Sequence, residues 1–248
     1  MDLHFKHLCY FGFSLPLGAF IACIFLSMYK DFESANHTHC QVDNIFPSIS
    51  ACISNFFPQN TLWRLCIGID SFPRYLIAFI YYNKYYIPKT NRMRKPTIYL
   101  YLIKLGFLFH IIELTSLLIL TYVSSVEIFF IHMISFVIFL ITSSFYMILT
   151  IWTYYLQRDD QSKEMSIREK YSKKLKLWTF LFYLTCFMMS LYFYIRHNTY
   201  CEPYIYSLFS LMEYLTVLAN IFYHSIIIYD LNLNNNTFKI SLIETKNF

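Results

Sequence analysis

The sequence predicts an all-α membrane protein, a six-transmembrane-helix bundle. Hydrophobic residues make up 57% of the 248 residues and charged residues only 14%, whereas about a quarter of a soluble domain is charged. Apolar runs of about 20 residues recur, the length that spans a hydrocarbon core of roughly 30 Å. We therefore expect one polytopic membrane domain, residues 1–230. A polar, asparagine-rich cytosolic tail, residues 231–248, follows it, and we expect this tail to be disordered.

The first predicted span covers residues 8–29. Lys6 precedes it, as in a signal peptide, but the apolar run is too long for a cleaved signal and no small-x-small cleavage site follows. We therefore expect a retained signal anchor. The longest join, residues 30–61, is predicted to be a structured loop, and the five further spans are predicted at 62–82, 98–123, 126–155, 177–195 and 205–229.

Lys and Arg are distributed unevenly between the two sides of the predicted membrane domain. Of these 20 residues, fifteen lie on the side that holds both termini, three lie within spans, and only Lys30 and Arg196 lie on the opposite side. The positive-inside rule then places both termini in the cytosol and loop 30–61 outside or in a lumen. We expect no nucleic-acid partner, because that would need a basic face with base-reading or stacking groups.

The predicted lumenal loops carry a sequon and three cysteines. Asn36 begins the sequon Asn-His-Thr, so we expect it to be glycosylated. Disulfides form on this oxidising side, and Cys40 can pair with Cys201, which would join the first loop to the last, or with Cys52. No C-x-x-C pair or His/Cys cluster with zinc spacing occurs. We therefore expect no metal ion and no cofactor.

Ionisable side chains lie inside the predicted spans, where they are costly and by default mark a functional site. At about 1.5 Å per residue, Asp70, Glu113 and Glu213 lie about 12–15 Å from the lumenal ends of their spans, and His132 lies within about 10 Å of its own. Arg74 follows Asp70 by four residues, on the same helix face. These groups either form interhelical ion pairs or line a polar cavity that holds a lipid headgroup. We favour the cavity, because pairing alone needs few charges.

Three polar residues of the last span, Glu213, Asn220 and His224, fall within an arc of about 40° and should face the bundle. His224 lies near the cytosolic end, where we expect it to serve packing or an interface hydrogen bond. His110 and Glu113, three residues apart, are candidates for a hydrogen-bonded pair. No G-x-S-x-G nucleophile elbow is present.

Several sequence motifs resemble one known family, the post-GPI attachment to proteins factor 2 family. The resemblance covers roughly residues 5–230 and is spread over every predicted lumenal loop. Its motifs are Asn44-x-x-Pro47-Ser48-Ile49-Ser50, Trp63-Arg64-x-Cys66-Ile67-Gly68, Ser71-x-Pro73-Arg74, Leu120-Thr121-Tyr122-Val123-Ser124-Ser125-x-Glu127, Arg196-His197-Asn198-x-Tyr200-Cys201-Glu202 and Glu213-Tyr214-x-x-Val217-Leu218-x-Asn220.

The resemblance implies a multi-pass protein of the Golgi and/or endoplasmic reticulum membrane that remodels the lipid of GPI anchors. The implied step is reacylation of lyso-GPI at sn-2 with a saturated fatty acid during maturation and transport of GPI-anchored proteins. Its implied partners are membrane lipids, lyso-GPI-anchored proteins and other GPI-processing membrane proteins. Two alternatives stay open: an acyltransferase, with acyl-CoA or a lipid as donor, and a non-catalytic lipid-binding scaffold that assists a separate acyltransferase.

The resemblance also suggests roles for the charged residues. Arg64 and Arg74 are candidates for binding the headgroup phosphate, because guanidinium suits that group. The family pattern has His before Ser-x-Pro-Arg, whereas this chain has Asp70, which we expect to stay ionised beside Arg74 and to be a weak base. The candidate catalytic residues are Asp70, Glu113, His132 and Glu213.

Overall fold

The computed structural model describes residues 5–86, 96–156 and 167–230, and the predicted tail lies outside the described residues. Within these ranges the chain is helical with short connections and contains no strand, so the predicted all-α class is confirmed. The long helices are α1 (Phe5–Lys30), α4 (Gln59–Tyr86), α5 (Pro96–Tyr122), α6 (Phe129–Leu156), α7 (Ile167–Tyr200) and α8 (Ile205–Ser225). The short helices are α2 (Phe32–Asn36), α3 (Ile49–Ser54) and α9 (Ile227–Asp230).

Five of the described helices are long and apolar enough to cross a membrane: those within Cys9–Lys30, Thr97–Tyr122, Phe129–Thr153, Ile167–Tyr200 and Ile205–Asp230. α4 is as long as these, with 28 residues. Its apolar run is interrupted by Asp70 and Arg74 in the central turns, and Arg64 lies in its second turn.

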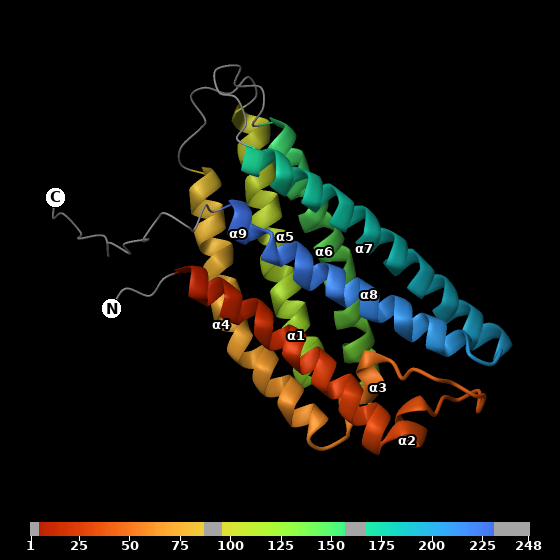
Figure 1. Ribbon diagram of the computed structural model, residues 1–248. Coiled ribbons are helices and arrows are strands. Elements are labelled where there is room, and N and C mark those ends of the chain that lie inside the picture. The colour runs from red at the N-terminus through yellow and green to blue at the C-terminus, as the bar shows by residue number, and fades with distance from the viewer. Residues whose placement is uncertain (1–4, 87–95, 157–166, 231–248) are drawn as a thin grey trace.

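The helices pack as neighbouring pairs. α1 lies on α4, α4 on α5 and α5 on α6, and α7 and α8 form a long antiparallel hairpin that closes against α6 and α1 (Figure 1). α2, α3 and the turn between α7 and α8 gather at one end of the bundle, hereafter the loop end. The start of α1 and helix α9 lie away from it.

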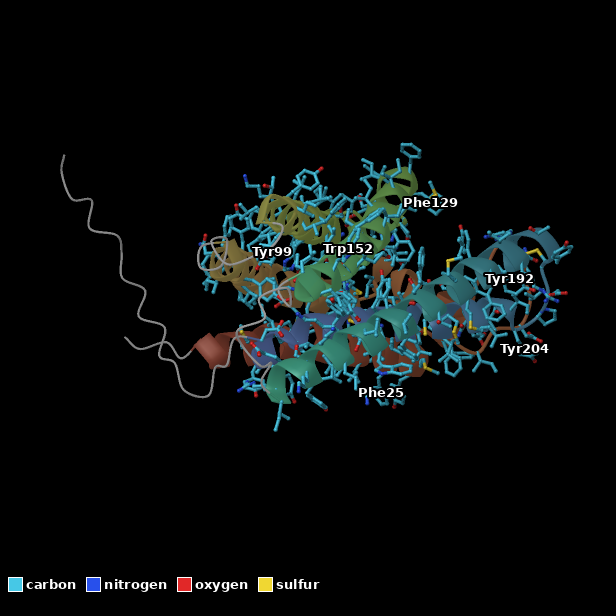
Figure 2. The ribbon with its side chains drawn as sticks, turned by 90° about the horizontal axis from the view of Figure 1, so that it is seen from above. Phe25, Tyr99, Phe129, Trp152, Tyr192 and Tyr204 are labelled. Atoms are coloured by element: carbon cyan, nitrogen blue, oxygen red, sulfur yellow. A yellow bond between two sulfur atoms is a disulfide. The ribbon has the colours of Figure 1, made fainter. Side chains whose placement is uncertain are left out.

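The outside of the bundle is rich in large apolar side chains. Phe25, Trp152 and Tyr192 are each more than half exposed, and Figure 2 shows Phe25 and Tyr192 at the edges of the bundle. Exposed apolar surface on this scale is costly in water and is covered by lipid in a membrane protein. The polar side chains are instead enriched inside, where Asp70 and Glu113 are almost completely buried.

The helix that contains the fifth predicted span is longer than that span. The polar join before the fifth predicted span was expected to reach residue 176, but α7 already begins at Ile167. Lys, Arg and Glu are good helix formers, so this basic segment continues the helix beyond its apolar part. Its Lys176 is buried near the far end of the bundle, where Nζ forms an ion pair with Asp230 of α9 and donates to Tyr81 of α4 (3.0 Å).

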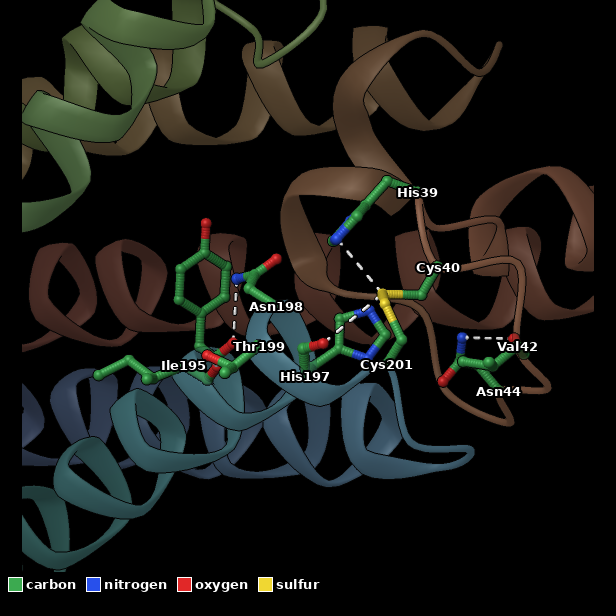
Figure 3. The surroundings of a disulfide bond; sticks show 10 residues. His39, Cys40, Val42, Asn44, Ile195, His197, Asn198, Thr199 and Cys201 are labelled. Atoms are coloured by element: carbon green, nitrogen blue, oxygen red, sulfur yellow. Dashed lines mark hydrogen bonds between the residues drawn. A yellow bond between two sulfur atoms is a disulfide. The ribbon is translucent and has the colours of Figure 1, made fainter.

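The first loop is structured, and it is fastened to the α7–α8 turn. A disulfide joins Cys40 to Cys201, the first of the two pairings that the sequence allowed (Figure 3). The carbonyl oxygen of Asp43 accepts from the N–H of Tyr204 (2.9 Å), and the N–H of Ile45 donates to Ser207 Oγ (2.7 Å). Cys52 is a free, fully buried thiol, and its burial raises its pKa to about 12.

Candidate functional site

A cavity lies between α3 and the long helices near the loop end. Most of its lining is apolar, with side chains such as Trp63 and Phe139, and its volume is about 50 Å³. That is room for a few water molecules. Its polar lining consists of Ser50, Arg74, Thr121, His132, Glu213 and Asn220.

Ser50 and His132 form a hydrogen-bonded pair in this cavity. Ser50 Oγ lies 3.0 Å from His132 Nε2, and the other ring nitrogen, Nδ1, lies 2.8 Å from the carbonyl oxygen of Val123. A carbonyl oxygen can only accept, so Nδ1 carries the proton and Nε2 accepts from the serine hydroxyl. A hydroxyl, a base and a group that orients the base make up the arrangement that activates a nucleophile.

α3, which carries Ser50, is held in place by α8. Glu213 Oε2 accepts from the backbone N–H of Ile49 (3.0 Å), and the Tyr206 hydroxyl donates to Ser48 Oγ (2.9 Å). Ser48 is also the N-cap of α3, because its Oγ accepts from the N–H of Ala51 (3.1 Å). Glu213 therefore lines the cavity and positions the helix at its edge.

Asp70, a second carboxylate predicted at this level, does not line the cavity. It is fully buried, its Oδ2 lies 3.8 Å from Arg74 Nε, and neither oxygen has a hydrogen-bond partner among the described residues. It faces α1, where a Cβ on Gly12 would lie only 3.1 Å from Asp70 Oδ1. Glycine at this position thus lets α1 approach the carboxylate, while Arg74 reaches the cavity lining.

Glu113 lies in a second buried cluster, with His224 and His110. Glu113 Oε1 is 2.9 Å from His224 Nε2 and accepts from Asn220 Nδ2 (2.8 Å). The expectation that Glu113 pairs with His110 is wrong, because the His110 ring instead stacks on those of His224 and Tyr146, with centroids 4.9 and 4.3 Å apart. His224, which we expected to serve packing or an interface hydrogen bond, is thus the partner of the Glu113 carboxylate.

Arg64 is paired rather than free. Its Nη2 lies 3.0 Å from Glu127 Oε2 and donates to the carbonyl oxygen of Tyr122 (3.2 Å), which ties α4 to the α5–α6 turn. The backbone N–H of Ser124 and the Arg64 guanidinium together lower the pKa of the Glu127 carboxyl. Arg64 is absent from the cavity lining, so of the two arginines only Arg74 is at the cavity.

Asn36 is less accessible than its glycosylation sequon suggests. Asn36 is buried, and both atoms of its side-chain amide lack a hydrogen-bond partner among the described residues. A glycan on this nitrogen would require the segment to open. The disulfide leaves Cys40 and Cys201 without thiols, so they cannot ligate a metal together with the nearby His39.

The sequence pointed to His132, Arg74 and Glu213, and the structure brings all three to one cavity. It did not point to Ser50, which lies in a predicted loop and has no motif of its own. Two signals could have pointed to the pair: the resemblance motif that ends at Ser50 and the motif that contains Val123. Neither motif shows that the two segments are in contact.

Residues 4–233 match the family described as Frag1/DRAM/Sfk1/Cwh43P N-terminal domain. The chain is 39% identical over 211 residues to a Xenopus tropicalis protein named acyltransferase PGAP2, which covers 85% of this chain and 81% of that protein. It is 35% identical over 239 residues to Caenorhabditis elegans post-GPI attachment to proteins factor 2, covering 95% and 88% of the two chains. A Danio rerio acyltransferase PGAP2 is 40% identical over 200 residues, covering 80% and 82%. No solved structure matches the chain.

Proposed function

The chain belongs to the post-GPI attachment to proteins factor 2 family, and on that premise we propose that it remodels GPI-anchor lipids by reacylating lyso-GPI at sn-2 with a saturated fatty acid. The observation that supports a catalytic role is the Ser50–His132 pair, oriented by the Val123 carbonyl in an apolar cavity. The named acyltransferases among its relatives support the reaction class.

We infer that six helices cross the membrane, with α4 as the sixth span and both termini in the cytosol. The loop end then faces the lumen of the Golgi apparatus or the endoplasmic reticulum. Two independent features support this orientation: the excess of Lys and Arg at the opposite side and the Cys40–Cys201 disulfide, which needs an oxidising compartment. The ionisable groups of α4 agree with a span, because Asp70 and Arg74 are buried inside the bundle.

The proposed reaction passes through an acyl-serine. Ser50 Oγ attacks the carbonyl carbon of the acyl donor while His132 Nε2 takes the hydroxyl proton. The donor's thiolate or alkoxide leaves and receives that proton from His132. The sn-2 hydroxyl of lyso-GPI then attacks the acyl-serine, with His132 as base and then acid, so one ester is broken, one is formed and Ser50 is restored. No oxidant or reductant is needed.

The surroundings of the pair suit this reaction. The apolar lining accommodates an acyl chain, and Arg74 supplies a buried positive charge beside it. The cavity is much smaller than a lipid, so substrate entry requires a part of its wall to move. α3 is the natural candidate because it has only six residues. It is held by the bonds from Glu213, Tyr206 and His132, by the bond from Ser27 Oγ to the Cys52 carbonyl oxygen, and by the packing of its buried apolar residues.

The second candidate function is a non-catalytic protein that presents lyso-GPI to a separate acyltransferase. The small cavity favours it, and so does the fact that the Ser50–His132 bond also ties α3 to α6. The two candidates differ in one respect that can be measured: only the enzyme turns over by itself.

The test uses the full chain purified in detergent, with lyso-GPI and either a saturated acyl-CoA or phosphatidylcholine as donor. We expect acyl transfer by the wild type, its loss in Ser50→Ala and His132→Gln, and retention in Ser54→Ala. Ser54 is the matched control because it lies on the same helix but donates only to the Ala51 carbonyl (3.0 Å). Labelled donor should leave an acyl group on Ser50, identified by mass spectrometry.

Turnover that survives in Ser50→Ala but not in His132→Gln would replace the acyl-serine by direct attack of lyso-GPI. Saturable lyso-GPI binding with no turnover, with either donor, would establish the scaffold instead. Lipid analysis of GPI anchors from cells that lack the protein tests whether either candidate, enzyme or scaffold, is correct. Unchanged anchors would contradict the family function in this chain.

A further inference from the structure

The buried cluster of His110, Glu113 and His224 has the composition of a metal site. Each residue offers one ligand atom: a ring nitrogen from each histidine and a carboxylate oxygen from the glutamate. These three atoms lie within 4.8 Å of one another. Two imidazoles and one carboxylate are a donor set that catalytic zinc sites use. All three side chains are less than 10% exposed.

The distances suit a first-row transition metal. An ion about 2.1 Å from each ligand in a tetrahedral site needs ligand atoms about 3.4 Å apart. The His224 Nε2 and Glu113 Oε1 atoms are already 2.9 Å apart. One ring nitrogen of His110 lies within 4.8 Å of both other ligand atoms, so the three can converge on one ion.

Two features of the cluster are unexplained without a ligand. Glu113 Oε2 is buried and has no hydrogen-bond partner among the described residues. An unsatisfied buried carboxylate oxygen costs more than a neutral group, and an ion is one of the few partners that offsets that cost. The His110 ring makes no hydrogen bond within the described chain and only stacks on its neighbours, so one of its nitrogens is free to coordinate.

The surroundings support the carboxylate and leave an open position. Asn220 Nδ2 donates to Glu113 Oε1 (2.8 Å) and to Ser143 Oγ (2.6 Å), which holds the ligand in place as outer-shell partners do. A small cavity of about 20 Å³, distinct from the one at Ser50, is lined by His110 and His224. That is room for one water molecule, the fourth ligand of an open zinc site.

Local charge does not prevent binding. Two cations line the same small cavity, and each is paired: the Arg74 guanidinium lies 3.8 Å from the Asp70 carboxylate, and Lys176 Nζ forms an ion pair with Asp230. The ion would thus share the region with three carboxylates and two cations. Binding also displaces the proton between His224 and Glu113, because a metal ligand must be deprotonated.

We propose that His110, Glu113 and His224 bind one divalent transition-metal ion, zinc by donor set, which joins α5 to α8 in the middle of the bundle. No sequence motif pointed to this site, because its ligands come from two helices and His224 lies 111 residues from Glu113. The site goes beyond the proposed reacylation and does not depend on it.

The test is metal analysis of the full chain, purified in detergent with a non-histidine affinity tag and without chelator. We expect inductively coupled plasma mass spectrometry to find about one zinc ion per chain in the wild type. Glu113→Gln, His110→Gln and His224→Gln should each lose most of it. His132→Gln is the matched control: it removes a buried histidine outside the cluster and should keep the metal.

Cobalt substitution gives a second readout that needs no variant to fold. Co²⁺ added to the chelator-treated wild type should give the intense visible absorption bands of four-coordinate cobalt, and zinc should abolish them. Wild type without stoichiometric metal and with only the weak bands of hydrated cobalt would overturn the proposal. Metal that persists in all three cluster variants would overturn it too. The cluster would then be a buried Glu113–His224 hydrogen-bonded pair with the His110 ring stacked beside it.

Discussion

Removing the Glu213 carboxylate should loosen α3 and lower the reactivity of Ser50 together. Glu213 Oε2 is the acceptor for the Ile49 N–H at 3.0 Å, and both residues are buried. In Glu213→Ala that N–H loses its partner, which costs about 1–3 kcal/mol. Taking about 2 kcal/mol, and about 2–4 °C per kcal/mol for a chain of this size, the apparent Tm should fall by about 4–8 °C.

The assay is thermal unfolding of the detergent-purified variant, with fluorophosphonate labelling of Ser50 measured in parallel. Glu213→Gln keeps an oxygen that can accept from Ile49, so it should lose much less stability and keep most of the labelling. The control is Glu202→Ala, at a glutamate paired with Arg196 (2.6 Å) but partly exposed, and we expect no measurable change. A Glu213→Ala protein with wild-type Tm and wild-type labelling would refute the idea that this bond positions the helix.

Three further predictions concern other bonds of the bundle. Cys40→Ser and Cys201→Ser should each destabilise the fold equally, by at most about 5 kcal/mol for a sequence separation of 161 residues, and the double variant no further; unequal losses in thermal unfolding would contradict the pairing. Because Ser124 and Arg64 lower the pKa of Glu127 in the fold, the stability that this pair contributes is present at neutral pH and lost as the pH falls through the lowered pKa. The difference in Tm between wild type and Glu127→Gln should therefore shrink in acid, and a constant difference would count against it. Lys176→Met leaves the carboxylate of α9 without its buried cation, and thermal unfolding should show a loss of about 3 kcal/mol; an unchanged Tm would mean that this pair is not formed.

The long helices were predictable because their length follows from apolar run length. The predicted span 98–123 corresponds to α5 (Pro96–Tyr122), and the tight turn after it falls between α5 and α6. The ionisable residues inside the predicted span 62–82 could also be read from the sequence. Whether a helix with such residues crosses the membrane depends on whether neighbouring helices cover them. α3 was not predictable as a helix, because six residues have too short an apolar pattern and tertiary bonds decide their conformation.

The depth of the site residues in the membrane could be predicted from the sequence, but the direction in which each side chain faces could not. Counting residues placed Asp70, Glu113 and Glu213 at a similar level, yet depth says nothing about helix rotation or tilt. Asp70 faces α1 across Gly12, Glu113 faces the far end of α8 at His224, and only Glu213 faces the cavity. The Ser50–His132 pair depends on where a loop returns to the bundle, which no periodicity within either segment encodes.

The disulfide between Cys40 and Cys201 has a consequence for the order of biogenesis. Cys40 is synthesised before 160 residues that include four long helices, so its thiol must wait in the membrane-inserted chain until the α7–α8 turn arrives. Ile45 and Asp43 likewise find their partners only on the last hairpin. The segment that presents Ser50 is therefore completed last, after translation of α8. A chain that ends or misinserts before the α7–α8 turn would therefore keep a free thiol at Cys40.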